Sequence, residues 1–229
     1  MRTTRERYAL LALAVSSVAL LILLFVAFQP TFGKSPEAAD RWLSPQERLG
    51  KQIFFDTNLS EPRGMSCASC HALDQDFSGN NGGTFGVAPG SRPGISGLRN
   101  TQSLTYASFA PPFHFEKDEN GKLAPVGGFF RDGRAESLAA QAEKPLLNPR
   151  EMNNPDVSSL VRKMAEGAYA GLFRQLSGQD IFDHPDRALA FAAQALQAFE
   201  RIPIFHPFSC RYDYCIRGRV GGQPAVFLR

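Results

Sequence analysis

Five consecutive residues, Cys67-Ala68-Ser69-Cys70-His71, constrain this chain more than any other feature of its sequence. Two cysteines separated by two residues and followed directly by histidine form the attachment signature of c-type haem. In such a site the two thiols bond to the vinyl groups of the porphyrin, and the adjoining imidazole becomes the proximal ligand of the iron. The sequence therefore predicts one covalent haem c, held by Cys67 and Cys70, with His71 on the iron.

Two other kinds of site use closely spaced cysteines, and the surrounding sequence disfavours both. A redox-active dithiol is typical of a thioredoxin-like strand and helix unit, whereas the residues around this motif are rich in glycine and indicate loops. A structural zinc site needs a second pair of ligands, and Cys210 and Cys215 are too widely spaced and too distant to supply it. These last two cysteines either form a disulfide in an oxidising compartment or have no role, and the sequence leaves both open.

The N-terminal segment predicts export from the cytoplasm. Residues 9–28 carry no charge and follow Arg2, Arg5 and Arg7. Twenty apolar residues are long enough to cross a bilayer as a helix, and the preceding positive charges place its N-terminus in the cytoplasm. We expect an uncleaved signal-anchor in the inner membrane, with a signal peptide cleaved near Thr31-Phe32-Gly33 as the alternative. Both predict a periplasmic protein, and c-type haem is attached outside the cytoplasm.

Composition divides the chain into four predicted parts. Residues 1–33 form the signal-anchor or signal peptide, 34–43 a polar tether, 44–208 the haem domain and 209–229 an irregular tail. The formal net charge is +3, most of which belongs to the leader. The exported part is therefore close to neutral, which excludes a basic face for nucleic acid.

The haem domain is expected to begin with a short helix. Ser44-Pro45-Gln46-Glu47 combines an N-cap serine, a proline at the first helical position and the glutamate of a capping box. Leu49 and Ile53 are four residues apart and share one face of this helix. The helix should end near Phe55-Asp56.

Later segments predict a hairpin and several helices. Apolar runs within 113–130 flank the turn Asp118-Glu119-Asn120-Gly121, which indicates a β-hairpin. Residues 137–143 should form a helix stopped by Pro145. Apolar periodicity predicts further helices, one opened by Asn154-Pro155 and the others over 168–176 and 185–200. We therefore expect an all-α, cytochrome c-like haem domain with long loops and a small hairpin, whose haem edge is enclosed by Leu49, Ile53, Leu160, Met164, Leu196 and Phe199.

Several short blocks resemble a known family. They are Phe54-Phe55-Asp56, Leu59-Ser60, Met65 to His71, Asp76-Phe77, Arg99-Asn100-Thr101, Asp132-Gly133-Arg134-Ala135, Ser137-Leu138, Gln141-Ala142, Pro149, Glu151-Met152, Phe199-Glu200-Arg201 and Pro207-Phe208. In order and spacing they resemble the N-terminal haem domain of bacterial di-haem cytochrome c peroxidases and MauG-type enzymes. The resemblance covers roughly residues 44–207.

The resemblance implies roles for residues that the motif alone does not identify. Gln141 and Glu151, ten residues apart, match the pair that lines the distal pocket of this haem. A carboxylate there can move a proton between the two oxygens of hydrogen peroxide, and the amide can orient the peroxide. Asn100 matches a residue that contributes to a calcium site in the family. The resemblance also implies that a c-type cytochrome or another periplasmic donor supplies electrons.

Three departures from the family pattern affect these expectations. Residues 84–98 contain no distal histidine, so the haem should be open on that side, with His114, His184 and His206 as the remaining candidates for a sixth ligand. Arg131 stands where the family has a tryptophan between its two haems, and it is expected to pair with a haem propionate or to face solvent. A second haem motif does not follow, which suggests a truncated or frame-shifted reading frame.

The sequence thus predicts a haem c-dependent peroxidase, specifically the N-terminal, peroxide-binding half of a di-haem enzyme. One alternative is a membrane-tethered electron carrier with a single haem, in which Met65 or Met152 would be the second iron ligand. Another is a non-functional truncated remnant.

Overall fold

The computed structural model describes residues 40–83, 86–209 and 213. The chain divides into two compact units, Met1–Trp42 and Leu43–Arg229, and the account below concerns the second. The predicted membrane segment at 9–28 lies outside the described residues, as do Cys210 and Cys215. No helix among the residues described is both long and apolar enough to cross a membrane.

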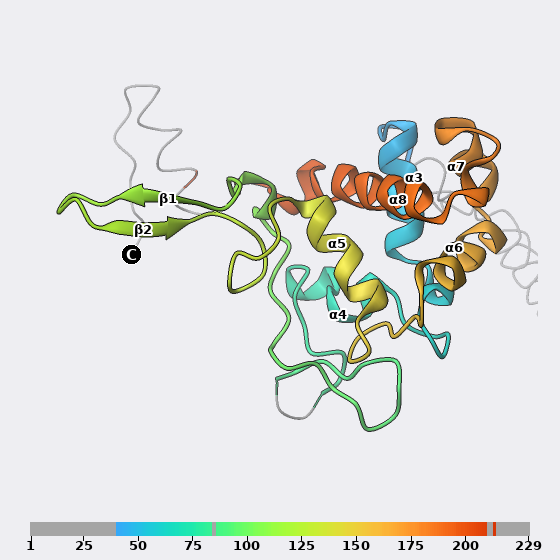
Figure 1. Ribbon diagram of the computed structural model, residues 1–229, viewed down its shortest axis with the longest axis horizontal. Coiled ribbons are helices and arrows are strands. Elements are labelled where there is room, and N and C mark those ends of the chain that lie inside the picture. The colour runs from blue at the N-terminus through green and yellow to red at the C-terminus, as the bar shows by residue number, and fades with distance from the viewer. Residues whose placement is uncertain (1–39, 84–85, 210–212, 214–229) are drawn as a thin grey trace, which may run out of the picture. The chain divides into compact units, whose positions relative to one another are not determined.

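The second unit is mostly helical and carries one small hairpin (Figure 1). The coarse fold prediction is therefore confirmed. Its α-helices and strands are α3 (Pro45–Phe54), α4 (Cys67–Cys70), β1 (His114–Lys117), β2 (Leu123–Val126), α5 (Leu138–Leu147), α6 (Val157–Glu166), α7 (Ala170–Ser177) and α8 (Pro185–Glu200). Short 3₁₀ turns at Thr57–Leu59, Leu73–Gln75, Ala107–Phe109, Ile181–Asp183 and Pro203–Phe205 connect them.

Helix α3 forms as the sequence predicts. The Ser44 hydroxyl accepts the Glu47 N–H at 3.3 Å, and the Glu47 carboxylate accepts the Ser44 N–H at 2.6 Å. Leu49 and Ile53 are fully buried. Gly50 lies so close to α8 that an added Cβ would be 1.9 Å from the carbonyl oxygen of Ala195. Only glycine permits this separation of the two helices, because any side chain would collide with backbone.

Helix α8 is the centre of the core. It starts at Pro185 and ends at Glu200, as predicted. The residues expected on its inner face are all buried, namely Leu189, Ala192, Ala193, Leu196 and Phe199. Both α3 and α5 pack on it. At the C-terminal end of the helix, the Phe199 ring packs edge-on against Phe205 and in a tilted arrangement against Phe54.

Two helix boundaries differ from the prediction. Pro145 does not stop α5, which continues to Leu147. Proline removes a single backbone hydrogen bond, and the extra turn buries Leu146 almost completely. Helix α6 begins at Val157 rather than at Asn154, because Asp156 is its N-cap and accepts the Ser159 N–H at 2.7 Å.

The hairpin has the predicted turn. His114 pairs with Val126 and Lys117 with Leu123, in antiparallel register. Phe115 and Leu123 lie on the same face of this ribbon, and each is about 60% exposed. The base of the hairpin is attached to the domain by a bridge between Phe129 and Ala135.

Candidate haem site

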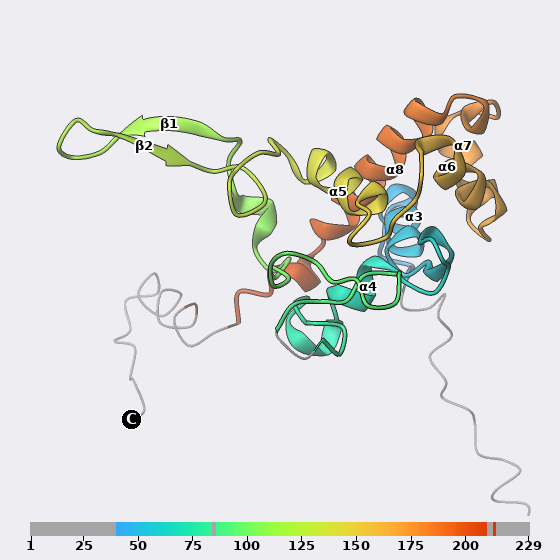
Figure 2. The same cartoon turned by 60° about the horizontal axis from the view of Figure 1, so that its bottom comes forward.

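The predicted site residues line one cavity of about 640 Å³. Its lining includes Cys67, Cys70, His71, Asn100, Gln141 and Glu151. Figures 1 and 2 both show the haem-motif turn α4 below α5, with the glycine-rich loops beyond it. The volume lies within the range typical of small-molecule and cofactor pockets.

The haem motif forms a single helical turn. The His71 N–H donates to the Cys67 carbonyl at 2.9 Å, and the Ser66 N–H donates to the Ser69 hydroxyl at 3.0 Å. On the imidazole, Nδ1 lies 2.9 Å from the carbonyl oxygen of Phe77. That contact fixes the ring through Nδ1, the arrangement usual for metal-binding histidines. Burial lowers the pKa of His71, which favours the neutral ring that metals bind.

The two thiols lie in surroundings that raise their pKa values. Burial raises the pKa of Cys67 to about 12, and the neighbouring charge of Glu200 contributes. Burial also raises the pKa of Cys70 to about 11, with a contribution from Glu151. Redox-active cysteines have depressed pKa values, so the environment disfavours that alternative on physical grounds.

Glu151 and Gln141 come from different segments. Gln141 lies on α5, and Glu151 lies in the loop between α5 and α6. Burial raises the pKa of Glu151, while the charge of Arg134 and a hydrogen bond from Asn148 oppose the shift. A partly buried carboxyl with a raised pKa is suited to proton transfer.

The three remaining histidines lie away from this cavity lining. His114 is exposed on the hairpin, with Nδ1 2.8 Å from the Pro112 carbonyl oxygen and Nε2 2.7 Å from Glu116. His184 precedes α8 and pairs with Asp180 at 3.3 Å. His206 is not a simple surface residue, since its Nδ1 is buried and the ring packs edge-on against Phe109.

Two methionines do line the cavity. Met65 and Met152 are buried there, at 7% and 4% exposure. Both were predicted as possible second ligands of an electron carrier. The structure therefore retains a geometric basis for that alternative.

Asn100, which the resemblance relates to a calcium site, is contacted by Arg131. The Arg131 guanidinium donates to the Asn100 side-chain oxygen and lies 3.4 Å from its carbonyl oxygen. Both are oxygens that Asn100 could offer a cation. Among the residues described there is no group of three or more His, Cys, Asp or Glu side chains that could hold a metal ion. Arg131 was expected to pair with a haem propionate or to face solvent, and in the structure its guanidinium contacts Asn100.

Sequence reasoning assigned no role to Glu200, although it lines the cavity. The residue is 5% exposed, its Oε2 is buried with no hydrogen-bond partner in the described part of the chain, and burial raises its pKa to about 8. Helical spacing could have found it. Glu200 lies four residues after Leu196 and eleven after Leu189, on the same inward face of α8.

Comparisons with known proteins identify the family of this chain. The sequence pattern that defines the family described as di-haem cytochrome c peroxidase matches residues 44–221, so this chain belongs to that family. The family binds c-type haem, is periplasmic, and uses peroxide and cytochrome electron donors. The resemblance found from the sequence is confirmed.

Particular relatives show how much of such a protein is present here. The methylamine utilization protein MauG of Paracoccus denitrificans is 40% identical over 173 residues, which are 74% of this chain and 44% of that protein. The cytochrome c551 peroxidase of Nitrosomonas europaea is 30% identical over 66% of this chain and 38% of its own length. The crystal structure of the diheme peroxidase BthA from Burkholderia thailandensis has a TM-score of 0.68 and 38% identity, covering 75% of this chain and 41% of that one. The chain spans less than half the length of these relatives.

Proposed function

We propose that this chain binds one haem c and acts as the peroxide-binding half of a di-haem cytochrome c peroxidase. The observation that carries the proposal is that Gln141 and Glu151 line the same cavity as Cys67, Cys70 and His71. Residues 44–208 would form the haem domain, with residues 1–33 as the anchor or signal peptide, 34–43 as the tether and 209–229 as the tail.

The cavity fits a haem by the chemistry of its lining. Two protonated thiols can form thioethers, and a neutral imidazole can bind the iron. Apolar side chains suited to a porphyrin also line it, among them Leu104, Leu138 and Leu196. Four arginines complete the lining, and guanidinium groups suit carboxylates such as propionates; they are Arg99, Arg131, Arg134 and Arg150.

Two side chains that line the same cavity as the motif, Glu151 and Gln141, supply the proton chemistry. When bound, haem supplies the iron at which peroxide is reduced. The Glu151 carboxylate accepts a proton from one peroxide oxygen and returns it to the other, departing oxygen. Gln141 orients the peroxide by hydrogen bonding. Two electrons come from a c-type cytochrome or a similar periplasmic donor.

Cyanide binding tests the role of Glu151 without any need for electrons. Hydrogen cyanide loses its proton as it binds ferric haem, so its association rate reports a nearby base. We expect Glu151→Gln to slow the association about 100-fold, within the usual contribution of a general base. The exposed Glu136→Gln serves as the matched control and should keep the wild-type rate. A wild-type rate in Glu151→Gln would refute the proposed role.

Haem attachment and turnover are measured on the same preparations. Cys67→Ser and Cys70→Ser should each lose one thioether, which shifts the pyridine haemochrome spectrum. Peroxide-dependent oxidation of a reduced c-type cytochrome then tests the whole reaction. If both serine variants keep the wild-type haemochrome spectrum, the attachment site is elsewhere.

The burial of Met65 and Met152 in the cavity favours a second candidate, a single-haem electron carrier. A carrier protects its iron with two strong axial ligands. It would give a low-spin ferric spectrum with a methionine-to-iron absorption band. The peroxidase role instead requires an open coordination position and a high-spin ferric signal.

A further inference from the structure

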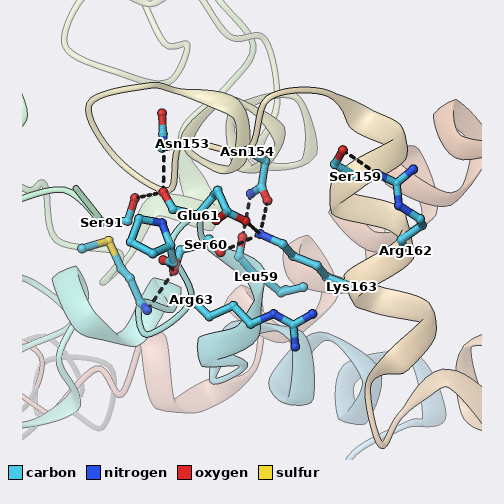
Figure 3. A network of polar contacts seen from close by, with 12 residues as sticks. Leu59, Ser60, Glu61, Arg63, Ser91, Asn153, Asn154, Ser159, Arg162 and Lys163 are labelled. Carbon is cyan, nitrogen blue, oxygen red and sulfur yellow. Dashed lines mark hydrogen bonds and ion pairs between the residues drawn. The ribbon is translucent and has the colours of Figure 1, made fainter.

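The buried ammonium group of Lys163, on α6, does not belong to the cavity lining, and Figure 3 shows its polar contacts. The Lys163 side chain is 8% exposed, and its Nζ donates to three oxygens. These are the Ser60 carbonyl at 2.6 Å, the Asn154 side-chain oxygen at 2.8 Å and the Glu61 carboxylate at 2.9 Å. All three ammonium hydrogens therefore have an acceptor.

The Asn154 side chain, which accepts from Lys163, is itself fully hydrogen-bonded. It is 3% exposed, and its amide nitrogen donates to the carbonyl oxygens of Leu59 at 2.6 Å and Leu146 at 2.8 Å. Its oxygen accepts from Lys163, so every polar atom of the amide is used. One side chain thus joins the 3₁₀ turn before the haem motif, the end of α5 and helix α6.

The same contacts reach both sides of the candidate haem site. On one side, the Ser60 hydroxyl accepts the Met65 N–H at 2.9 Å, two residues before the first motif cysteine. On the other side, the Glu61 N–H donates to the Met152 carbonyl at 2.7 Å, directly after Glu151. Asn153 adds a bond from its amide to the Glu61 carbonyl at 2.7 Å (Figure 3). Residues 59–61 are therefore bonded to the loop that carries Glu151 and to the start of the haem motif.

We infer that Lys163 is the positioning residue for Glu151. By binding Ser60, Glu61 and Asn154 at once, it fixes the loop of the proton-transferring carboxylate relative to the haem-attachment turn. A buried ammonium group adds little to the free energy of unfolding, because proteins in which apolar side chains replace buried ionic groups are often as stable or more stable. Its three directed bonds do hold the bonded segments in fixed positions. Such positions matter because small displacements of reacting groups lower reaction rates strongly.

The inference rests on the proposed function of Glu151, and a double-mutant cycle separates the two. Lys163→Met removes the ammonium and keeps an unbranched apolar stem. It is combined with Glu151→Gln in haem-loaded protein, and the probe is the association rate of potassium cyanide with ferric haem. Arg162→Met is the matched control, since Arg162 is the preceding residue, is exposed, and donates to the Ser159 hydroxyl of its own helix at 2.7 Å.

A positioning role predicts strong coupling in this cycle. Lys163→Met should slow cyanide binding about tenfold or more when Glu151 is present, and its pH profile should shift. In the Glu151→Gln background the same change should alter the rate less than about twofold, because no carboxylate remains to be positioned. Arg162→Met should leave the rate unchanged in both backgrounds.

The results that overturn the inference differ from those that overturn the proposed function. Equal slowing by Lys163→Met in both backgrounds, or no slowing at all, refutes the positioning role alone. An unchanged rate in Glu151→Gln refutes the proposed function and the inference together.

Asn153→Gly provides a second variant if Lys163→Met fails to fold. Asn153 has a positive φ of 58°, which glycine adopts without strain, and the change removes only the bond to Glu61. It should slow cyanide binding in the same direction and likewise lose its effect beside Glu151→Gln. A wild-type rate and pH profile in this variant would overturn the inference.

Discussion

Replacing Glu200 by glutamine should stabilise the protein and change how its stability depends on pH. The carboxyl group is buried at the cavity wall, and burial raises its pKa from the ordinary value of 4.5 to about 8. The folded state therefore holds a proton that the unfolded state releases between these two values. In that window the folded state binds more protons, so stability decreases as pH rises.

The magnitude follows from the two pKa values. Between pH 5.5 and pH 7.5, a group that titrates at 4.5 when unfolded and at about 8 when folded lowers the free energy of unfolding by about 2–3 kcal/mol. Glutamine has the same shape and does not titrate. The wild-type protein should lose about 2–3 kcal/mol more than Glu200→Gln over this interval.

Chemical denaturation of haem-loaded protein, followed by far-ultraviolet circular dichroism at the two pH values, measures this difference. Glu136→Gln removes a carboxylate from an exposed position and should keep the wild-type pH dependence. If wild type and Glu200→Gln lose the same free energy between pH 5.5 and 7.5, the carboxyl is not held protonated by burial. The reasoning from the cavity wall would then be wrong.

Two further substitutions test the helix that packs on α8. Gly50→Ala gains helix propensity but places a Cβ 1.9 Å from the Ala195 carbonyl oxygen. It should therefore lower the free energy of unfolding by about 1–3 kcal/mol. An equally stable variant would show that the two helices can move apart at no cost. Ser44→Ala removes the N-cap of α3 and should lower stability by about 1 kcal/mol, measured by the same denaturation method, whereas no loss would mean that water replaces the cap.

Local signals in the sequence predicted the parts of the fold that depend on neighbouring residues. The capping box at Ser44 set the start of α3, the Asp118–Gly121 turn set the hairpin, and Pro185 with regular apolar spacing set α8. Pro145 misled the prediction because tertiary burial of Leu146 outweighed the loss of one backbone hydrogen bond. The sequence around Pro145 does not reveal this tertiary packing.

The candidate site was predictable where a motif or a resemblance identified the residues. Cys67, Cys70 and His71 followed from spacing alone, whereas Gln141 and Glu151 needed the family pattern. Lys163 and Glu200 were missed because a charged residue on a helix is usually solvent-exposed. Their positions on inward faces were present in the helical spacing, but their partners come from distant segments.

The hairpin is attached to the rest of the protein in a way that affects its motion. Isolated two-stranded ribbons are marginal in water, and the apolar face of this one leaves Phe115 and Leu123 about 60% exposed. The ladder between β1 and β2 should therefore open and exchange its amide hydrogens long before the α3–α8 contact does. The bridge between Phe129 and Ala135 lies outside this ladder, and Phe129 lines the cavity, so the ladder can open without breaking this contact at the cavity wall.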